Sequence, residues 1–366
     1  MKVAYDHQIF CRQAYGGISR YFARLAEHIP TQNVDAKLFA PWHINRYLAD
    51  QPKNSIHGRF VPTYPRGLKA LAKAYNTLEV NRQLHSWAPD IVHETFYSWQ
   101  PSFHRHTRVT TVYDMISELF PESFKNPEKM THKKLKALDR ADHIICISEN
   151  TRLDLLNLFP IAEDKVSVVY LGCDAQPVSG HQSFDVLPTD APYIMYVGLR
   201  GGYKNFEALL KAVAASPQLK KDFHILCFGG GYFTLEEQKK IASLGIHEGQ
   251  VIQTSGSDQW LQHCLRHAST FVFPSLYEGF GIPPLEAMAS DCPVVCSNVS
   301  SMPEVVGDAA EFFDPTSAED LTRAIERVVY NPEVAAKLVL LGRQRLCQFT
   351  WDKCAQQTHQ VYASLI

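Results

Sequence analysis

The chain has 366 residues, of which 45% are hydrophobic and 20% charged, a composition typical of a globular enzyme with two domains. Its formal net charge of −2 excludes a strong general attraction to nucleic acid. The charge is uneven, because residues 1–174 hold 22 Lys and Arg against 18 Asp and Glu, whereas the remainder holds 14 against 20. The first half is therefore the better candidate to face an anionic surface.

The nine cysteines are scattered without a Cys-x-x-Cys pair, and we expect all of them to be reduced thiols. The first residues carry no apolar signal core. No stretch approaches the roughly 18 apolar residues that cross a bilayer. These features predict a cytoplasmic protein, with peripheral contact at the inner face of the membrane as an open alternative.

The first half alternates short apolar runs with helical patterns. We expect strands, some with the loops that follow them, at residues 2–5, 35–40, 89–94, 108–116, 143–147 and 166–170, and an irregular, proline-rich connection over residues 41–66. Gly16 and Gly17 precede a helix with one apolar face. This glycine pair either forms a tight turn or lets backbone amides meet a phosphate. His93, at the end of one strand, is either structural or catalytic.

Two basic helical patterns also occur in the first half, one beginning at Leu68 and one spanning residues 125–140. Each is either a solvated face or a contact for a membrane surface or an anionic acceptor.

The second half alternates strands and helices clearly. Residues 175–192 mix Gly, Ser, Gln and Pro without periodicity and predict an interdomain linker. Strands are expected at residues 193–197, 223–228, 250–254, 271–273 and 294–297. Thr234 and Glu237 form a capping-box pattern. We therefore predict two α/β domains with doubly wound parallel sheets, at residues 1–174 and 193–350, and a terminal helix at about 351–366.

The most informative stretch follows the expected strand at residues 271–273. Gly279 and Gly281 allow positive φ angles and a close approach of the backbone to a ligand. Pro283 and Pro284 suit the first turn of a helix. A helix start directs free N–H groups at one point and attracts an anion, most naturally a phosphate.

Four charged side chains in glycine-rich loops or at the expected helix start are candidates to contact the ligand. Glu278 lies in the loop and Glu286 in the expected first helical turn, where the helix dipole alone would also favour a carboxylate. Arg200 and Lys204 lie in another glycine-rich loop that follows a strand. Arg200 can grip phosphate oxygens bidentately and Lys204 adds a point charge, although a solvated loop is the alternative.

The sequence contains no Asp-x-Asp pair, and its 16 histidines show no metal-ligand spacing. We therefore expect no metal site, and we expect Arg200, Lys204 and the helix near Pro283 to neutralise the charge of a bound diphosphate. Glycines 229–231 follow a strand but lack the full dinucleotide fingerprint, which argues against a dehydrogenase.

Residues 274–289, Pro-Ser-x-Tyr-Glu-Gly-Phe-Gly-x-Pro-x-Leu-Glu-Ala-Met-Ala, resemble the signature of family four glycosyltransferases, which are retaining enzymes with the GT-B fold. The similarity continues at residues 292–295, 302–310 and 313–315. The resemblance implies two Rossmann-like domains with an interdomain cleft. It also implies an acceptor-binding first domain, a nucleotide-sugar-binding second domain and a terminal helix that crosses back onto the first.

The resemblance and the local chemistry together define the candidate site. The residues expected to contact the donor are Gly16, Gly17, Tyr113, Arg200, Lys204, Glu278, Gly279, Phe280, Gly281, Ile282, Leu285 and Glu286. The candidate catalytic residues are Glu278, Arg200, Lys204 and Asp114. Glu278 is expected to hold sugar hydroxyls, and Glu286 to accept hydrogen bonds from the ribose.

Tyr113 departs from a common family pattern, in which a histidine precedes the aspartate. A tyrosine, with a reference pKa of about 10, is a poor base at neutral pH. Asp114 either orients the acceptor hydroxyl or braces the loop. Some family members resemble this Thr-Val-Tyr-Asp-Met-Ile version.

We therefore expect a retaining glycosyltransferase that needs no metal or other cofactor. It would move a hexose, with mannose favoured by resemblance, from a GDP- or UDP-linked donor to a hydroxyl of a saccharide or lipid-linked acceptor. A front-face reaction, in which the leaving phosphate takes the acceptor's proton, fits a site without an obvious base, and a two-step covalent route is the alternative. Rival functions are a nucleotide-sugar epimerase and a catalytically silent nucleotide-sugar-binding protein.

Overall fold

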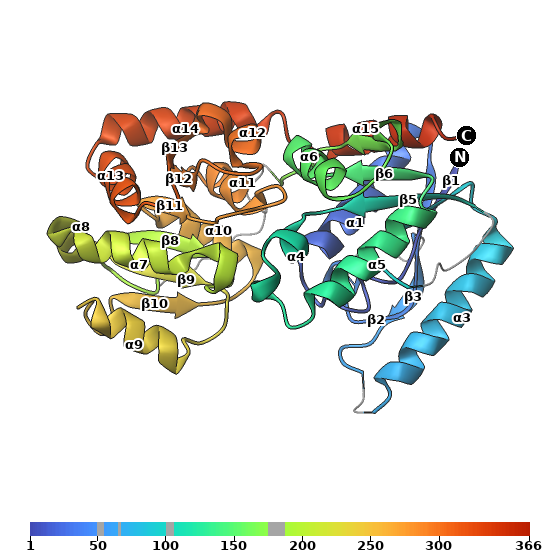
Figure 1. Cartoon of the computed structure of the whole chain (residues 1–366), viewed down its shortest axis with the longest axis horizontal. Coiled ribbons are helices and arrows are strands. Elements are labelled where there is room, and N and C mark those ends of the chain that lie inside the picture. The colour runs from blue at the N-terminus through green and yellow to red at the C-terminus, as the bar shows by residue number, and fades with distance from the viewer. Residues whose placement is uncertain (50–54, 65–66, 100–105, 175–186) are drawn as a thin grey trace. The chain divides into compact units, whose positions relative to one another are not determined.

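The computed structural model describes residues 1–49, 55–64, 67–99, 106–174 and 187–366, and the chain divides into two compact α/β units (Figure 1). The first unit comprises Met1–Gly172 and Trp351–Ile366, and the second comprises Cys173–Thr350. Of the linker expected over residues 175–192, residues 175–186 lie outside the described residues.

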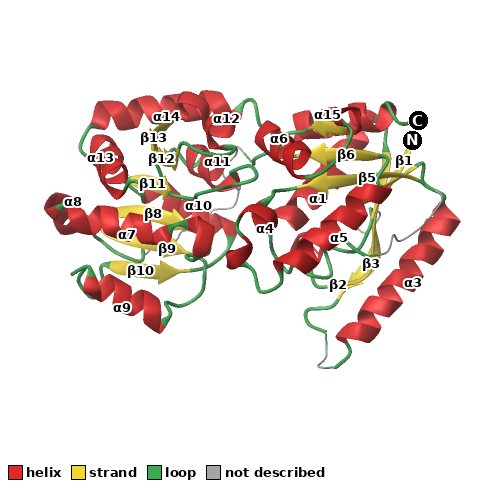
Figure 2. Ribbon diagram, viewed as in Figure 1, coloured by secondary structure: helices red, strands yellow, loops and turns green. Residues whose placement is uncertain are grey.

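The first unit is built on a seven-stranded parallel sheet with the order β3-β2-β1-β4-β5-β6-β7 (Figure 2). Its strands are β1 (Lys2–Tyr5), β2 (Asp35–His43), β3 (Ile56–Phe60), β4 (Ile91–Glu94), β5 (Thr107–Val112), β6 (His143–Cys146) and β7 (Val166–Val168). Its α-helices are α1 (Gly17–His28), α2 (Arg46–Ala49), α3 (Lys69–Trp87), α4 (Ile116–Leu119), α5 (Pro127–Arg140), α6 (Glu149–Leu158) and α15 (Trp351–Ala363). Short 3-10 turns are η1 (Ile29–Gln32), η2 (Pro121–Ser123) and η3 (Glu163–Lys165).

The expectation of an irregular connection over residues 41–66 is wrong for the described part of that segment. Strand β2 continues to His43, and α2 and β3 follow. The polar side chains of His57 and Arg59 interrupt the apolar pattern of β3, which explains why periodicity missed it. Its place at the edge of the sheet, paired with β2 alone, tolerates such residues.

Helix α15 joins the first unit from the other end of the sequence. The hydroxyl of Tyr362 lies 2.6 Å from His93 Nδ1, and His93 Nε2 lies 2.8 Å from Thr111 Oγ1. The imidazole is fully buried, and burial lowers its pKa to about 3. Since both ring nitrogens have partners, His93 is a structural residue that helps to anchor the terminal helix.

Helix α3 packs against the opposite face of the same sheet. Its Val80 and Leu84 contact Ala4 of β1, Phe39 of β2 and Val92 of β4. Because side chains alternate along a strand, the residues that follow Ala4 and Val92 in β1 and β4 point toward α1 and α15 instead. The sheet is thus covered on both faces, as a parallel sheet requires.

The second unit has a six-stranded parallel sheet with the order β10-β9-β8-β11-β12-β13. Its strands are β8 (Tyr193–Val197), β9 (His224–Phe228), β10 (Val251–Thr254), β11 (Thr270–Phe273), β12 (Val294–Ser297) and β13 (Ala310–Phe313). Its α-helices are α7 (Phe206–Ala215), α8 (Pro217–Asp222), α9 (Leu235–Ser243), α10 (Asp258–His267), α11 (Ile282–Ala289), α12 (Met302–Val306), α13 (Ala318–Val329) and α14 (Pro332–Leu346), with 3-10 turns η4 (Gly202–Lys204) and η5 (Gly307–Ala309).

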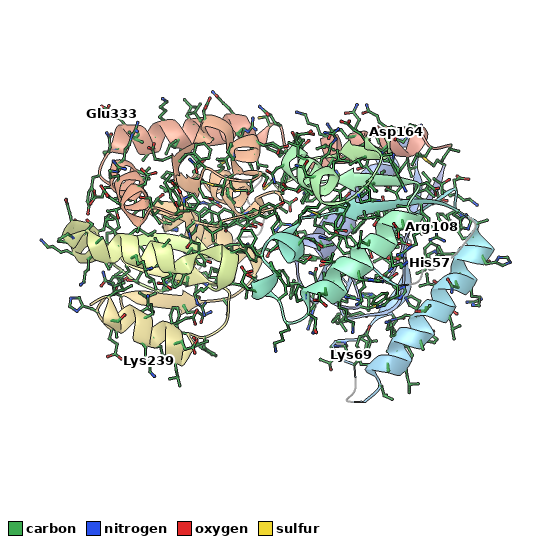
Figure 3. All side chains as sticks on the ribbon, viewed as in Figure 1. His57, Lys69, Arg108, Asp164, Lys239 and Glu333 are labelled. Atoms are coloured by element: carbon green, nitrogen blue, oxygen red, sulfur yellow. The ribbon has the colours of Figure 1, made fainter. Side chains whose placement is uncertain are left out.

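Helices α7, α8 and α13 form the main core of this unit with the sheet, through apolar residues such as Leu209, Leu219 and Ile325. Charged side chains such as Lys239 and Glu333 lie on the outer surface (Figure 3). The expected capping box at the start of α9 is confirmed, with reciprocal bonds between its two residues.

Each sheet reverses its strand order at one point. In the second unit β8 lies between β9 and β11, so the connections leave β8 and β11 in opposite directions. The first unit has the same arrangement at β1 and β4. The carboxyl ends of such strand pairs form a crevice, which is where ligands bind in open parallel sheets.

Candidate functional site

Loops that follow β8 and β11 are tied together at the reversal point of the second sheet. The backbone N–H of Leu276 donates to the carbonyl of Tyr203 at 2.7 Å. Asn205 has a left-handed backbone (φ 54°) and forms no side-chain cap on α7. Its amide instead donates to the carbonyls of Pro274 and Pro315, at 3.0 and 2.9 Å. These bonds fix the two glycine-rich loops side by side.

Lys204 and Glu278, which are 74 positions apart in the sequence, meet between these loops. Lys204 Nζ donates to Glu278 Oε1 at 2.6 Å, and Ser275 Oγ donates to the same oxygen at 2.6 Å. The backbone N–H of Glu278 donates to Ser300 Oγ, which comes from the loop after β12. Glu278 is only 9% exposed. The structure therefore brings together two predicted site residues and supports them with Ser275, which belongs to the motif at residues 274–289, and with Ser300, which no sequence motif singles out.

The turn into α11 depends on Gly281. Its φ of 117° is strained for other residues, and a Cβ there would lie 2.5 Å from the methyl carbon of Met302. The helix begins at Ile282, so Glu286 lies in its second turn. The expectation that Glu286 lies in the first turn is therefore wrong. The dipole effect fades beyond the first turn, so it does not explain this half-buried carboxylate.

Four other predicted donor contacts surround this turn. Phe280 is 3% exposed and packs edge-on against Phe349, with ring centroids 5.6 Å apart. Leu285 is fully buried. Both side chains thus serve the core, and Phe280 can reach a ligand only through its backbone. Gly279 is buried, and Ile282 is half-buried at the first position of α11.

Arg200 is placed differently from the sequence expectation. Its Nε donates to Glu237 Oε1 at 2.7 Å, and its terminal nitrogens donate to carbonyls of residues 229–232 at 2.9 to 3.4 Å. Glycines 229–231 all have positive φ angles of 70 to 80°. Burial raises the pKa of Glu237, but the bonds from Arg200 and Thr234 outweigh it, so the pKa is lowered. In this conformation most guanidinium donors hold the glycine loop, which leaves few for a bidentate phosphate contact.

Gly16 and Gly17 lie at the amino end of α1 in the first unit. The backbone of Gly16 is extended, and a Cβ there would meet the flexible side chain of Gln13. A Cβ at Gly17 would meet nothing within 4 Å. The loop is therefore open on the side of Gly17, as an approach to a ligand requires, but neither position demands glycine for its backbone conformation.

Tyr113 and Asp114 follow β5 in the first unit. The Tyr113 hydroxyl donates to the carbonyl of Thr95 at 3.0 Å, and burial raises the pKa of this buried phenol well above its ordinary value. Asp114 Oδ1 accepts the backbone N–H of Ile116 at 3.1 Å, at the start of α4. Lys134 Nζ donates to the Asp114 carbonyl at 2.9 Å. This geometry favours the loop-bracing role for Asp114.

Within the described ranges, no group of three or more His, Cys, Asp or Glu side chains is arranged to hold a metal ion. Every helix in the described part of the chain is too short or too polar to span a membrane.

Two Rossmann-like parallel sheets, one with a lysine–glutamate pair at its reversal point, are the architecture of GT-B glycosyltransferases, and comparison with known proteins identifies the class. Residues 181–345 match the family described as Glycosyl transferases group 1, and residues 15–176 match Glycosyltransferase Family 4. The chain belongs to these glycosyltransferases and is an enzyme. The resemblance seen in residues 274–289 is thereby confirmed.

Two of the relatives of this chain are named mannosyltransferases. The O-antigen chain mannosyltransferase B of Escherichia coli is 32% identical over 328 residues, which are 86% of this chain and 85% of that protein. The MMP alpha-(1->4)-mannosyltransferase of Mycolicibacterium hassiacum is 31% identical over 235 residues, 61% of this chain and 54% of that protein.

Solved structures share the fold. Sucrose-phosphate synthase from Thermosynechococcus elongatus has a TM-score of 0.77 at 19% identity, with 100% of this chain and 98% of that chain covered. Anabaena Alr3699/HepE, in complex with UDP-glucose, has a TM-score of 0.74 at 18% identity, with both chains fully covered.

Proposed function

We propose that the chain is a retaining hexosyltransferase that moves mannose from a nucleotide-diphosphate donor to a hydroxyl of a saccharide or lipid-linked acceptor, without a metal ion. The observation that carries this proposal is the 2.6 Å contact between Lys204 Nζ and Glu278 Oε1, beside the start of α11. The names of the two mannosyltransferase relatives support mannose. GDP-mannose is therefore the first donor to test, with UDP-hexoses as the alternative.

In this proposal Lys204 and the first N–H groups of α11 face the donor diphosphate. When the bond between C1 of the sugar and the phosphate oxygen breaks, the electron pair moves to that oxygen. Fixed positive charge lowers the barrier most at this developing charge. These groups are part of the protein, which is the basis for proposing a metal-independent reaction.

The acceptor hydroxyl then bonds to C1 from the face that the phosphate leaves and gives its proton to that phosphate. Configuration at C1 is retained, and no protein base is required. Tyr113 is a poor alternative base, because its hydroxyl already donates to the Thr95 carbonyl and its pKa is raised by burial.

Glu278 is proposed to orient the transferred sugar. Its Oε1 already accepts bonds from Lys204 and Ser275, whereas its Oε2 has no hydrogen-bond partner among the described residues. An ionised carboxylate oxygen is an acceptor only, so Oε2 is suited to a sugar hydroxyl. Glu286, in the second turn of α11, is proposed to accept hydrogen bonds from the ribose.

Peripheral membrane contact, at the inner face of the membrane, is proposed through α3. Its Leu71 and Leu78 are 65% and 71% exposed on one side of the helix, and lysines lie nearby in its first turns. Exposed apolar residues beside basic ones are typical of helices that lie on an anionic lipid surface.

The test is a turnover assay with GDP-mannose, UDP-glucose and UDP-galactose, each with and without a mannose-terminated acceptor. We expect acceptor-dependent release of GDP from GDP-mannose, an α-linked product by NMR, and the same rate in EDTA. Donor conversion without acceptor would identify an epimerase, and nucleotide-sugar binding without release would identify a silent binding protein. Loss of turnover in EDTA, restored by Mg²⁺, would contradict metal independence.

A further inference from the structure

A pocket of about 570 Å³ opens in the first unit at the reversal point of its sheet. The loops after β1 and β4 and the helices α3 and α5 form its walls. The lining residues that matter here are His7, Arg12, Lys69, Lys73, Trp99 and Lys133. No Asp or Glu is among the described lining residues. The two basic helical patterns noted in the sequence thus converge on one cavity.

Arg12, Lys69, Lys73 and Lys133 form no ion pair with any described residue. Burial lowers the pKa of Lys133, and the neighbouring positive charges, including Arg12 and Lys73, lower it further. Asp6 offsets part of the charge of Arg12, and the remaining like charges create a positive potential that attracts an anion.

Two other cations of α5 form ion pairs with carboxylates of the protein. Lys134, next to Lys133 on α5, donates to Glu118 Oε2 at 2.6 Å. Arg140, at the end of α5, donates to both carboxylate oxygens of Glu94. These two cations of α5 are therefore paired within the protein, whereas the pocket cations, three of which are exposed, are left available to an anion in the pocket.

His7 provides a second, independent observation. Its side chain is 7% exposed, and its Nδ1 is buried without a hydrogen-bond partner in the described structure. Burial lowers the pKa of His7; nearby Asp6 opposes this effect, while Lys73 and Arg12 add to it. An unpaired buried polar atom beside a pocket costs free energy that no hydrogen bond in the described structure offsets.

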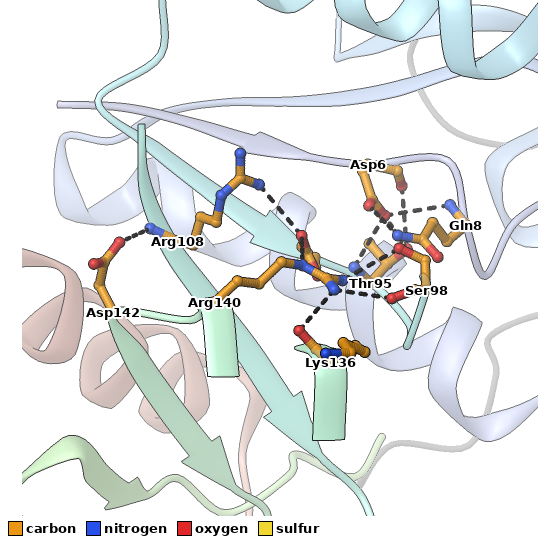
Figure 4. Close-up of polar contacts among 9 residues, drawn as sticks. Asp6, Gln8, Thr95, Ser98, Arg108, Lys136, Arg140 and Asp142 are labelled. Atoms are coloured by element: carbon orange, nitrogen blue, oxygen red, sulfur yellow. Dashed lines mark hydrogen bonds and ion pairs between the residues drawn. The ribbon is translucent and has the colours of Figure 1, made fainter. Parts of the chain in front are cut away.

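A polar network connects residues at the starts of the loops that follow β1 and β4 (Figure 4). Asp6 Oδ1 accepts bonds from the backbone N–H and the hydroxyl of Thr95, at 3.0 and 2.6 Å. Gln8 donates to the other Asp6 oxygen at 2.9 Å. Arg140 donates to the carbonyl of Ser98 at 2.9 Å. Residues 6–8 and 95–98, at the starts of these two loops, are thus pre-organised, which lowers the entropic cost of binding.

We propose that this pocket binds a phosphate group carried by the acceptor, with the adjoining sugar placed against Trp99. Four cations are more than a ligand with a single carboxylate would need. They suit a phosphate or diphosphate, which has several oxygens to accept their hydrogen bonds. Trp99 is 45% exposed and offers an indole surface beside these cations. The inference rests on the proposed transferase function and names its acceptor class as phosphorylated, either on a lipid-linked diphosphate or on a glycan.

The test is calorimetric titration of the full chain with citronellyl diphosphate, inorganic diphosphate and citronellol. Lys73→Gln with Lys133→Gln removes two pocket cations. Lys125→Gln with Lys136→Gln, two exposed lysines near or on α5 that are not among the lining residues, is the matched control for charge. We expect the pocket variant to bind both diphosphates at least about tenfold more weakly than wild type. The control should bind like wild type, and citronellol should not bind.

Diphosphate that binds at the donor loop does so equally in wild type, the pocket variant and the control variant, so it does not contribute to the difference in affinity between them. Tighter binding of citronellyl diphosphate than inorganic diphosphate would identify a lipid-linked source, and equal binding would identify a glycan phosphate. Equal affinities in wild type and the pocket variant would overturn the proposal. The titration requires no donor and no turnover, so this result is separate from failure of the transferase assay.

Discussion

Replacing Lys204 with alanine is the most direct test of the donor site. The side chains of Lys204 and Glu278 are only 18% and 12% exposed, so solvent screens their 2.6 Å contact only partly. Removing one pre-organised group from a developing charge costs at least about 100-fold in turnover, or about 2.7 kcal/mol at about 1.36 kcal/mol per tenfold. Glu278→Ala should cost a similar factor, because it removes the proposed sugar contact and leaves Lys204 unpaired.

Stability must be separated from catalysis in this experiment. Leaving one partner of a mostly buried pair without its counter-charge costs about 1–3 kcal/mol of folding free energy. Nucleotide release should therefore be measured at saturating donor and well below the melting temperature of each variant. Lys240→Ala is the matched control, because it breaks a 2.5 Å ion pair with Glu207 in which both side chains are well exposed. It should turn over like wild type.

A double variant, Lys204→Ala with Glu278→Ala, completes the cycle. Since both groups act on one reacting centre, its loss should be clearly smaller than the product of the two single losses. Turnover within about threefold of wild type in both folded single variants would refute the assignment of this pair, on the magnitudes expected for such groups.

Three further predictions follow from contacts elsewhere in the chain. Arg200→Gln and Glu237→Gln should each raise KM for the donor about tenfold and increase hydrogen exchange in residues 229–232. A higher KM in the arginine variant alone would instead indicate that Arg200 contacts the phosphate directly. Because the pKa of His93 falls from 6.5 to about 3 on folding, the unfolded chain takes up its proton first as pH falls. Urea unfolding should show that wild type loses about 1 kcal/mol more stability than His93→Gln between pH 6.5 and 5.5, and equal losses would contradict this. Leu71→Asp with Leu78→Asp should reduce sedimentation with anionic vesicles at least about tenfold, without changing turnover on a soluble acceptor.

The local pattern of apolar residues, glycines and prolines was sufficient to predict most of the helices and strands. The strands expected at residues 193–197 and 294–297 are β8 and β12, because continuous apolar runs are typical of strands buried in a parallel sheet. Glu278 and the glycines around it could also be singled out, since a strand, a glycine loop and a proline-started helix are contiguous in the chain. Strand β3 was missed, because its pairing with β2 and not its own side chains makes it a strand.

What the amino-acid sequence by itself determined is the set of elements, the parallel α/β class and the loops that carry charge. Only the tertiary structure decided which charges meet. Lys204 reaches Glu278 because sheet order places β8 next to β11, whereas Arg200 turns to Glu237 and the glycine loop after β9. Likewise, Lys73 and Lys133 share a pocket only because the fold brings α3 and α5 together beside the loops after β1 and β4. Such contacts depend on strand order and side-chain direction, which periodicity along the chain does not encode.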